Sequence, residues 1–208
     1  PKLSLHEVSG FTYRDNTGAR ALTGLSRAGT DESFAATWRE LRDWRAVPPT
    51  VDREAVVQVR LLGVPGTEVF VGTALGQRYI DARDVAQRVT VMCVRRKAER
   101  FREVPDAFVA VIDAWRQEAE VIRRIDRLAV AAGDQAAVGV RVTHLGGEDY
   151  VLSTTQDNVA TTFTDPETQK SLTLTGRLGV VRTCPGKPAV LTLLQGVRLT
   201  DGKDIVER

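Results

Sequence analysis

The chain has 208 residues, of which 42% are apolar and 27% are charged, and its formal net charge is +2. This composition is typical of a globular protein that can bury a core, and the length fits one large domain or two small ones. The small net charge gives no indication of a nucleic-acid partner, and no run reaches the roughly eighteen apolar residues that a membrane span needs.

The chain begins at Pro1, without a start methionine or an apolar signal stretch, so we expect a mature, trimmed or proteolysed product. Its basic residues are five lysines and twenty-four arginines. Guanidinium groups bind carboxylates and sulfates well, which would suit an acidic ligand. A GC-rich genome is the simpler explanation of the same bias.

The first half of the chain alternates between short apolar runs and turns that contain glycine or proline. We interpret residues 1–34 as an irregular segment that continues from a missing upstream part. Residues 56–62 and 67–73 are rich in β-branched side chains and flank a turn at 63–66, which predicts an antiparallel hairpin. Residues 78–87 are polar and are interpreted as an excursion or a short helix.

Residues 89–96 form the next predicted strand, which we expect to be buried together with Cys93. The charged run at 95–102 is interpreted as a solvated loop or strand end, with an anion site as the alternative. One further cysteine, Cys184, precedes a proline-glycine turn. Two cysteines define no disulfide framework, and we expect two free thiols, although the two could pair.

Residues 106–128 admit two interpretations. Their apolar residues recur at helical spacing, and the charged residues would then form the polar face of a helix. Alternatively, 108–115 and 121–130 are two strands joined by the polar residues 116–120. Because the surrounding segments are β, we favour two strands, and we expect Trp115 in the core.

The C-terminal third has the clearest strand pattern. Residues 137–145 and 150–155 flank a turn at 146–149 and predict a hairpin. Many short strands separated by glycines and prolines predict an all-β fold, a large antiparallel β-sandwich over residues 35–208 with at most one short helix. The remaining predicted strands are 172–174, 178–183, 189–194, 197–199 and 205–206.

No segment of the sequence assembles a complete catalytic, cofactor or metal site, and we expect none. For His144, beside Glu148 and Asp149, we favour an ordinary exposed turn histidine over a rim site. His6 lies in the irregular terminus and is interpreted as incidental. The sequence lacks a Gly-x-Ser-x-Gly elbow, a Walker loop and zinc-finger spacing. Residues 73–78 are not a phosphate loop, because no helical pattern follows them.

One cluster of aromatic and basic residues suits a ligand. Aromatic faces stack on sugar C–H surfaces and guanidinium forks hold carboxylates, so the cluster fits an acidic glycan. The alternative is that the tryptophans pack in the core and the arginines are solvated. The candidate substrate-binding residues are Trp38, Arg39, Arg42, Trp44 and Arg45.

Several segments have an order and spacing that match a known family. They are Leu-Leu-Gly-Val-Pro-Gly-Thr-Glu-Val-Phe-Val-Gly-Thr-Ala-Leu-Gly-Gln-Arg at 61–78, Val-Arg-Arg at 94–96 and Phe-Val-Ala-Val-Ile-Asp-Ala-Trp at 108–115, continued at 121–130, 138–142 and 149–153. This series resembles the C-terminal β-sheet domain of heparinase II/III-like polysaccharide lyases. The resemblance covers roughly residues 35–200.

The resemblance implies a secreted or periplasmic protein with an α/α toroid followed by an antiparallel β-sandwich. Such lyases cleave uronic-acid-containing polysaccharides by β-elimination, using residues of the toroid and of the early sandwich strands. No position here matches the family's catalytic tyrosine, asparagine or histidine motifs. The resemblance therefore implies a chain that is inactive alone, with an acidic polysaccharide and an upstream catalytic domain or companion chain as partners.

Two alternatives from other functional classes stay open. The chain could be a stand-alone carbohydrate-binding module, for which an exposed aromatic pair would be the surface signature. It could also be a structural β-sandwich module, such as a phage or surface protein, whose edge strands pair between chains. Neither alternative, nor the lyase interpretation, involves a nucleic-acid partner.

Overall fold

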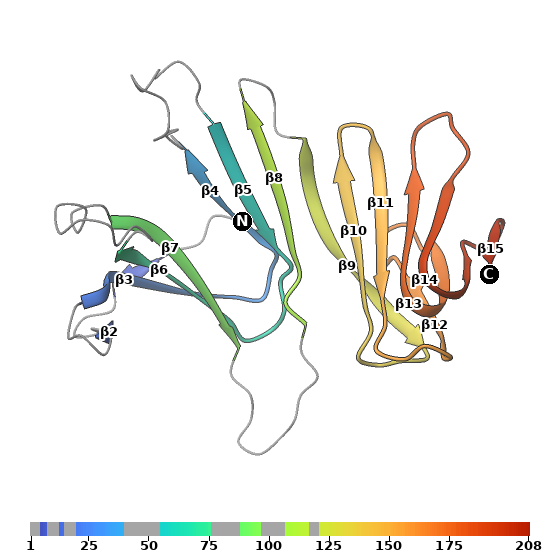
Figure 1. The fold of residues 1–208 in the computed structure, drawn as a ribbon, viewed down its shortest axis with the longest axis horizontal. Coiled ribbons are helices and arrows are strands. Elements are labelled where there is room, and N and C mark those ends of the chain that lie inside the picture. Colours follow the sequence, from blue (N-terminus) through green and yellow to red (C-terminus); the bar gives the residue numbers. More distant parts are fainter. Residues whose placement is uncertain are drawn as a thin grey trace. The chain divides into compact units, whose positions relative to one another are not determined.

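The structure is a computed structural model that describes residues 5–7, 13–14, 20–39, 55–75, 88–96, 107–116 and 121–208. All regular elements in these ranges are β-strands (Figure 1), and the strand pairings with a described register are antiparallel. The predicted all-β antiparallel fold is thus confirmed, and these ranges contain no helix. The chain divides into two compact units, residues 1–34 with 63–104 and residues 35–62 with 105–208.

The first unit contains one sheet, with the strand order β1-β3-β6-β7 and β2 also paired to β3. Val69 and Ala28 lie opposite each other on neighbouring strands and are almost fully buried. Three of these strands, β1 to β3, lie in the segment that the sequence suggested to be irregular. The strands are β1 (His6–Glu7), β2 (Tyr13–Arg14), β3 (Arg20–Thr30), β6 (Thr67–Leu75) and β7 (Arg88–Arg96).

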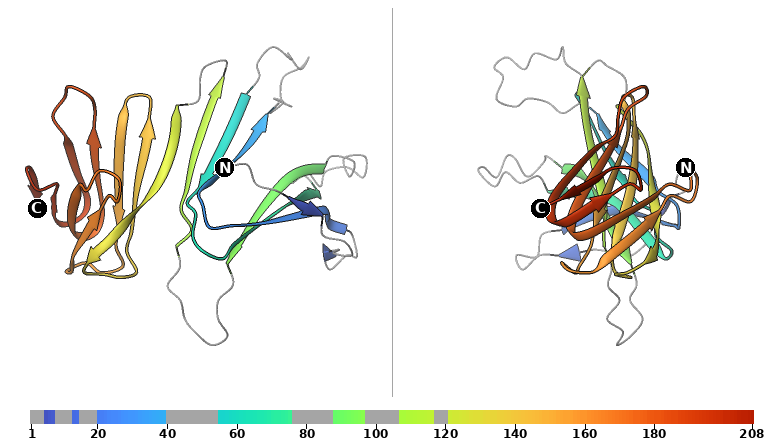
Figure 2. Two further views of the ribbon diagram at one scale, coloured as in Figure 1. Left: turned by 180° about the vertical axis from the view of Figure 1, so that it is seen from behind. Right: turned by 90° about the vertical axis from the view of Figure 1, so that its right-hand side faces the viewer.

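A second sheet has the order β4-β5-β8, and Figure 2 shows it from two further sides. The strands are β4 (Phe34–Arg39), β5 (Ala55–Leu61) and β8 (Ala110–Arg116). Strand β8 confirms the two-strand interpretation of residues 106–128, because Trp115 lies opposite Val56 in a regular ladder. Trp115 is only partly buried, so its expected place in the core is not observed.

The predicted hairpin of residues 56–62 with 67–73 is wrong. Both strands exist, as β5 and β6, but β5 pairs with β8 whereas β6 pairs with β3 and β7. The chain separates at the turn between them, where the Leu62 N–H donates to Val109 O at 3.1 Å and the Gly63 N–H donates to Ser33 Oγ at 3.0 Å. These bonds lead the two strands into different sheets.

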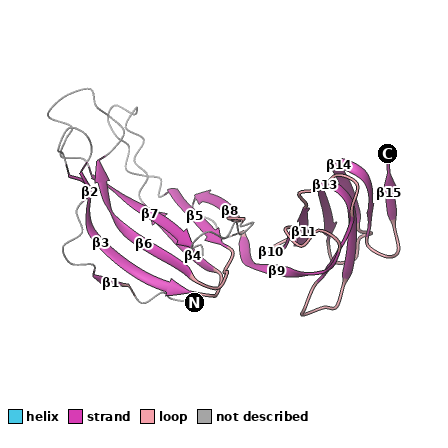
Figure 3. Cartoon of the chain, turned by 90° about the horizontal axis from the view of Figure 1, so that it is seen from below, coloured by secondary structure: helices cyan, strands magenta, loops and turns pink. Residues whose placement is uncertain are grey.

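The C-terminal strands form a closed barrel. Strand β9 pairs with β10, β10 with β11, β11 with β13, β13 with β12, and β12 returns to β9. Strands β14 and β15 extend the sheet beyond β13, and Figure 3 shows the strands curving round together. The strands are β9 (Ile122–Ala132), β10 (Val138–His144), β11 (Gly147–Ser153), β12 (Ala160–Thr164), β13 (Ser171–Thr183), β14 (Val190–Thr200) and β15 (Ile205–Glu207).

Two apolar clusters lie on opposite faces of the barrel wall. The interior is filled by apolar side chains from the barrel strands β9, β11, β12 and β13, among them Leu128, Leu152 and Phe163. Gly139 of β10 faces this interior, since a Cβ there would lie 2.6 Å from the Phe163 ring. The outer face of β9 and β10 buries Ile125, Val140 and Val142 together with Leu62.

Two sequence-based expectations need correction. Residues 121–208 form a closed barrel rather than two facing open sheets, because β13 is long enough to pair with β12 at its start and β11 at its end. Cys93 lies in a strand as predicted but is exposed, because its side chain shares the open face of the first unit's sheet with Phe70. Cys93 and Cys184 are both free thiols.

Candidate functional site

The predicted glycan-binding cluster is only partly described. Trp38 lies in β4 and is half-buried, and Arg39 is the last residue of that strand. Arg42, Trp44 and Arg45 lie outside the described residues. The described residues therefore do not test whether the five residues lie together, and their role stays a prediction.

The densest group of charges in the barrel surrounds Arg141 of β10, whose side chain is 4% exposed. Its guanidinium donates to Asp165 and to Asp126, both at 3.0 Å, and also to Glu167. Glu148 lies 3.9 Å from the same guanidinium. One buried cation therefore holds four carboxylates from β9, β11 and the turn after β12.

Strand register explains why this group faces the barrel interior. Arg141 lies directly between Asp126 on β9 and Tyr150 on β11, and opposed residues of an antiparallel pair point to the same face. Tyr150 is 2% exposed and belongs to the interior cluster. Its hydroxyl donates to Glu148 at 2.8 Å, so the charged layer covers the apolar interior at this position.

The ionisation states in this layer are fixed by its contacts. Although burial opposes its charge, the hydrogen bonds from Arg141 to Glu167 and Asp126 raise the pKa of Arg141. Burial likewise opposes the charge of Asp165, but the backbone N–H of Glu167 and Arg141 itself lower the pKa of Asp165. Burial and the bond to Glu148 raise the pKa of Tyr150, so Tyr150 stays a neutral donor.

A second buried carboxylate, Asp134, organises the opposite loops of the barrel. It accepts hydrogen bonds from the Thr155 N–H at 2.6 Å, the Thr155 hydroxyl at 2.7 Å and the Ala136 N–H at 3.0 Å. The Thr155 hydroxyl is the main cause that lowers the pKa of Asp134, against the effect of burial. Asp134 therefore joins two turns and has no open position for a substrate.

His144, for which the sequence favours an ordinary exposed turn histidine over a rim site, is partly buried in its turn. His144 Nδ1 accepts the Gly146 N–H at 3.1 Å, and Nε2 lies 3.7 Å from Asp149 Oδ2. Arg182 holds Asp149 through two bonds of 2.7 and 2.8 Å, which lowers the pKa of Asp149. Glu148 instead accepts the Tyr150 hydroxyl, so only Asp149 lies beside His144, and Asp149 is already held by Arg182.

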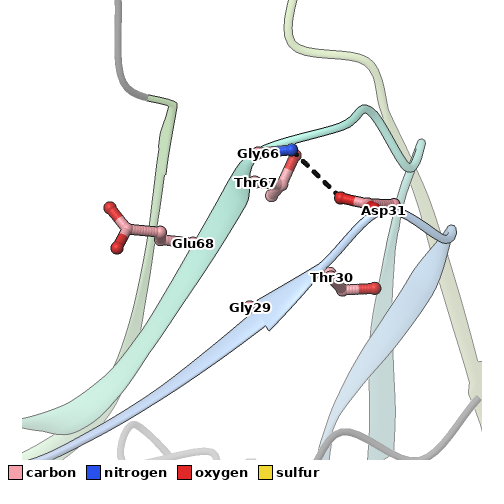
Figure 4. A pocket seen from close by; sticks show the side chains of 6 residues that line it. All are labelled: Gly29, Thr30, Asp31, Gly66, Thr67 and Glu68. Atoms are coloured by element: carbon pink, nitrogen blue, oxygen red, sulfur yellow. Dashed lines mark hydrogen bonds between the residues drawn. The ribbon is translucent and has the colours of Figure 1, made fainter.

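Two hollows lie outside these charged groups. In the first unit, a shallow hollow of about 490 Å³ lies where β3 ends and β6 begins, lined by Gly29, Thr30, Asp31, Gly66, Thr67 and Glu68 (Figure 4). In the second unit, a mostly apolar groove of about 370 Å³ runs beside β10 and β11. Phe108, 56% exposed, lies at this groove with Val138, Val140 and Val151.

The described ranges contain no group of three or more histidine, cysteine, aspartate or glutamate side chains arranged to hold a metal ion. They also contain no helix long and apolar enough to cross a membrane. No family model matches the chain, and no curated protein or solved structure matches it either.

Sequence reasoning missed the two arginine groups of the molecule. Arg141 sits in the alternating run of β10, where a charged residue is normally interpreted as facing solvent. Arg27 and Arg95, which pair with Glu68 in the first unit, lie far apart in sequence. The charged run at 95–102 was the one available signal, and its anion-site alternative includes Arg95.

Proposed function

We propose that these residues are the non-catalytic β portion of a heparinase II/III-like polysaccharide lyase. In this role they brace a catalytic toroid and shape one wall of the cleft for a uronic-acid-containing glycan. The proposal includes a secreted or periplasmic location. The chain by itself is then inactive.

The observation that carries this proposal is the mutual saturation of the buried ionisable groups. Arg141 is surrounded by four carboxylates, Tyr150 donates to Glu148, and Asp134 holds two turns. A general acid or base must be able to exchange its proton with a substrate. Groups that are buried and occupied by one another instead rigidify a scaffold.

The strand positions give further support. The family resemblance expects strands at 108–115, 121–130, 138–142 and 149–153, and the chain forms β8, β9, β10 and β11 there. An all-β chain with these strands suits the β portion of such a lyase. Fold alone does not assign a function, so activity has to be tested directly.

The test is to express the chain together with any residues encoded upstream of Pro1 and to assay it on heparan sulfate, alginate and chondroitin. β-Elimination leaves an unsaturated uronate whose ultraviolet absorbance reports the reaction. We expect the longer protein to be active and the 208-residue chain to be inactive. Activity of the short chain, or an inert longer protein, would contradict the proposal.

A stand-alone structural module is the second candidate, and one observation favours it. Strands β14 and β15 expose aliphatic side chains, with Val190 57% and Leu194 50% exposed. Between Val190 and Gly196, β14 pairs with β13 on one edge, and β15 pairs only with residues 198–200. Concentration-dependent self-association in sedimentation velocity, abolished by Leu194→Lys, would favour this candidate.

A further inference from the structure

Two arginines meet over one buried carboxylate on the exposed face of the first unit's sheet. Arg27 of β3 lies opposite Phe70 of β6, which lies opposite Cys93 of β7, and Glu68 lies opposite Arg95 in the next row. Directly opposed residues, and residues two apart on one strand, point to the same face. We call these five residues, Arg27, Glu68, Phe70, Cys93 and Arg95, the arginine face.

Glu68 holds both guanidinium groups in place. Arg95 binds Glu68 Oε2 through Nε at 2.8 Å and Nη2 at 2.7 Å, and Arg27 forms an ion pair with Oε1. The Glu68 side chain is 8% exposed, whereas those of Arg27 and Arg95 are 49% and 55% exposed. A guanidinium has five N–H donors, and the described bonds to Glu68 involve two nitrogens of Arg95 and one of Arg27.

The arrangement is preorganised for an anion. The Arg95 guanidinium lies over the Phe70 ring, 5.0 Å from its centroid, which further limits the freedom of this long side chain. Within the arginine face, two guanidiniums against one carboxylate leave an excess of positive charge. The nearby Asp31 does not cancel it on this face, because Figure 4 shows Glu68 extending away from Asp31, which accepts the Gly66 N–H at 3.0 Å.

We propose that the arginine face binds an anionic sugar residue of an acidic polysaccharide. The carboxylate or sulfate of the sugar bridges Arg27 and Arg95, and its ring packs beside Phe70. Guanidinium forks match both anions in geometry, and an aromatic edge beside them favours a ligand with a C–H surface. This inference rests on the proposed function only in its choice of an acidic polysaccharide.

The exposed thiol of Cys93 supplies a direct test that needs no change in the arginines. Cys93 lies two residues from Arg95 on the same strand face, a spacing of about 6.6 Å. In a Cys184→Ser background, we expect heparin oligosaccharides to slow iodoacetamide alkylation of Cys93 at least fivefold, and neutral dextran to leave the rate unchanged. Unchanged alkylation while the oligosaccharide is bound would overturn the proposal.

Variants then test the anion contacts by isothermal titration at low salt. Arg27→Gln and Arg95→Gln are each expected to raise Kd about tenfold, because each removes hydrogen bonds to a charged group. The matched control is Arg198→Gln, which removes the same charge from a side chain that is 50% exposed and paired with Glu207. Its Kd should change less than twofold, and equal losses in all three variants would refute a specific site.

One further variant and a comparison of two glycans complete the test. Phe70→Leu keeps both guanidiniums and Glu68, so it should fold like the wild type by circular dichroism and weaken binding by a few-fold. Heparin carries sulfates and alginate only carboxylates, so comparing them identifies which anion is bound. The proposed binding site would be refuted if both arginine variants bound either glycan with full affinity. It would also be refuted if the wild type bound neither glycan. The lyase assay tests the proposed function separately.

Discussion

Replacing Arg141 with methionine is expected to lower the unfolding free energy by about 3–5 kcal/mol at neutral pH, the cost of breaking a buried ion pair from one side. Arg141 is 4% exposed, and its partner Asp165 is 1% exposed, so the Asp165 charge would be left without its main counter-ion. Asp126 would keep its 2.7 Å pair with Arg124, and Glu167 is 55% exposed and can turn to water. Most of the cost therefore comes from Asp165.

The measurement is urea unfolding followed by far-ultraviolet circular dichroism. Arg182→Met is the matched control, since Arg182 also binds a carboxylate through two bonds but its side chain is 56% exposed. An exposed pair contributes little, so the control should barely move the urea midpoint. Similar midpoint shifts in the two variants would refute the argument that burial of the ion pair determines its effect.

A double variant tests whether the unpaired charge of Asp165 causes the loss of stability. Asp165→Asn keeps the side-chain acceptor for the Glu167 and Thr168 N–H groups but removes the negative charge. Combined with Arg141→Met, it should recover part of the lost stability, because no buried charge then lacks a partner. A double variant that is less stable than Arg141→Met alone would show that the Asp165 charge is not the source of the cost.

The same layer predicts a pH dependence. The pKa of Asp165 is lowered by backbone N–H groups and Arg141 despite its burial, and the hydrogen bond from Arg141 lowers the pKa of Glu167. A carboxylate with a lowered folded-state pKa stabilises the protein above its unfolded pKa of about 4 and loses this contribution as pH falls through the folded pKa. The unfolding free energy of the wild type should thus decrease below about pH 4. The difference in unfolding free energy between the wild type and Arg141→Met should become smaller there.

Three further predictions concern the barrel. Gly176→Ala should lower the unfolding free energy by about 2 kcal/mol or more in urea unfolding, because its φ is +144° and a Cβ would lie 2.3 Å from the Gly196 Cα. The matched control is Gly202→Ala, which should cost about 1 kcal/mol, because φ is +89° there but the space around the residue is open. Asp134→Ala should cost about 2–3 kcal/mol and speed hydrogen exchange at the Thr155 amide, and an unchanged exchange rate would contradict its role in joining the turns. In an ultraviolet pH titration, Tyr150 should ionise at a pH above the ordinary tyrosine pKa of about 10. A Tyr150→Phe variant should lack this ionisation at high pH.

The strands and their faces could be predicted from the sequence where alternation and turns agree. The turn at 146–149 places β10 against β11, and the register from Val138–Ser153 to His144–Gly147 follows directly. At 108–115 the helical spacing competed with a strand, and pairing with β5 decided it. Helical periodicity in a short apolar run cannot exclude a strand, because tertiary pairing supplies hydrogen bonds that local sequence does not reveal.

Only the tertiary structure determined what the charged residues do. The sequence alone established an antiparallel β chain without motifs for a nucleotide, a zinc ion or a serine nucleophile. It could not place Arg141 inside the barrel, since Asp165 and Glu167 come from a turn more than twenty residues away and reach it only when β12 and β13 close the ring. Nor could it bring Arg27 and Arg95 to Glu68, because cross-strand partners depend on register, and register is fixed by the sheet rather than by neighbouring residues.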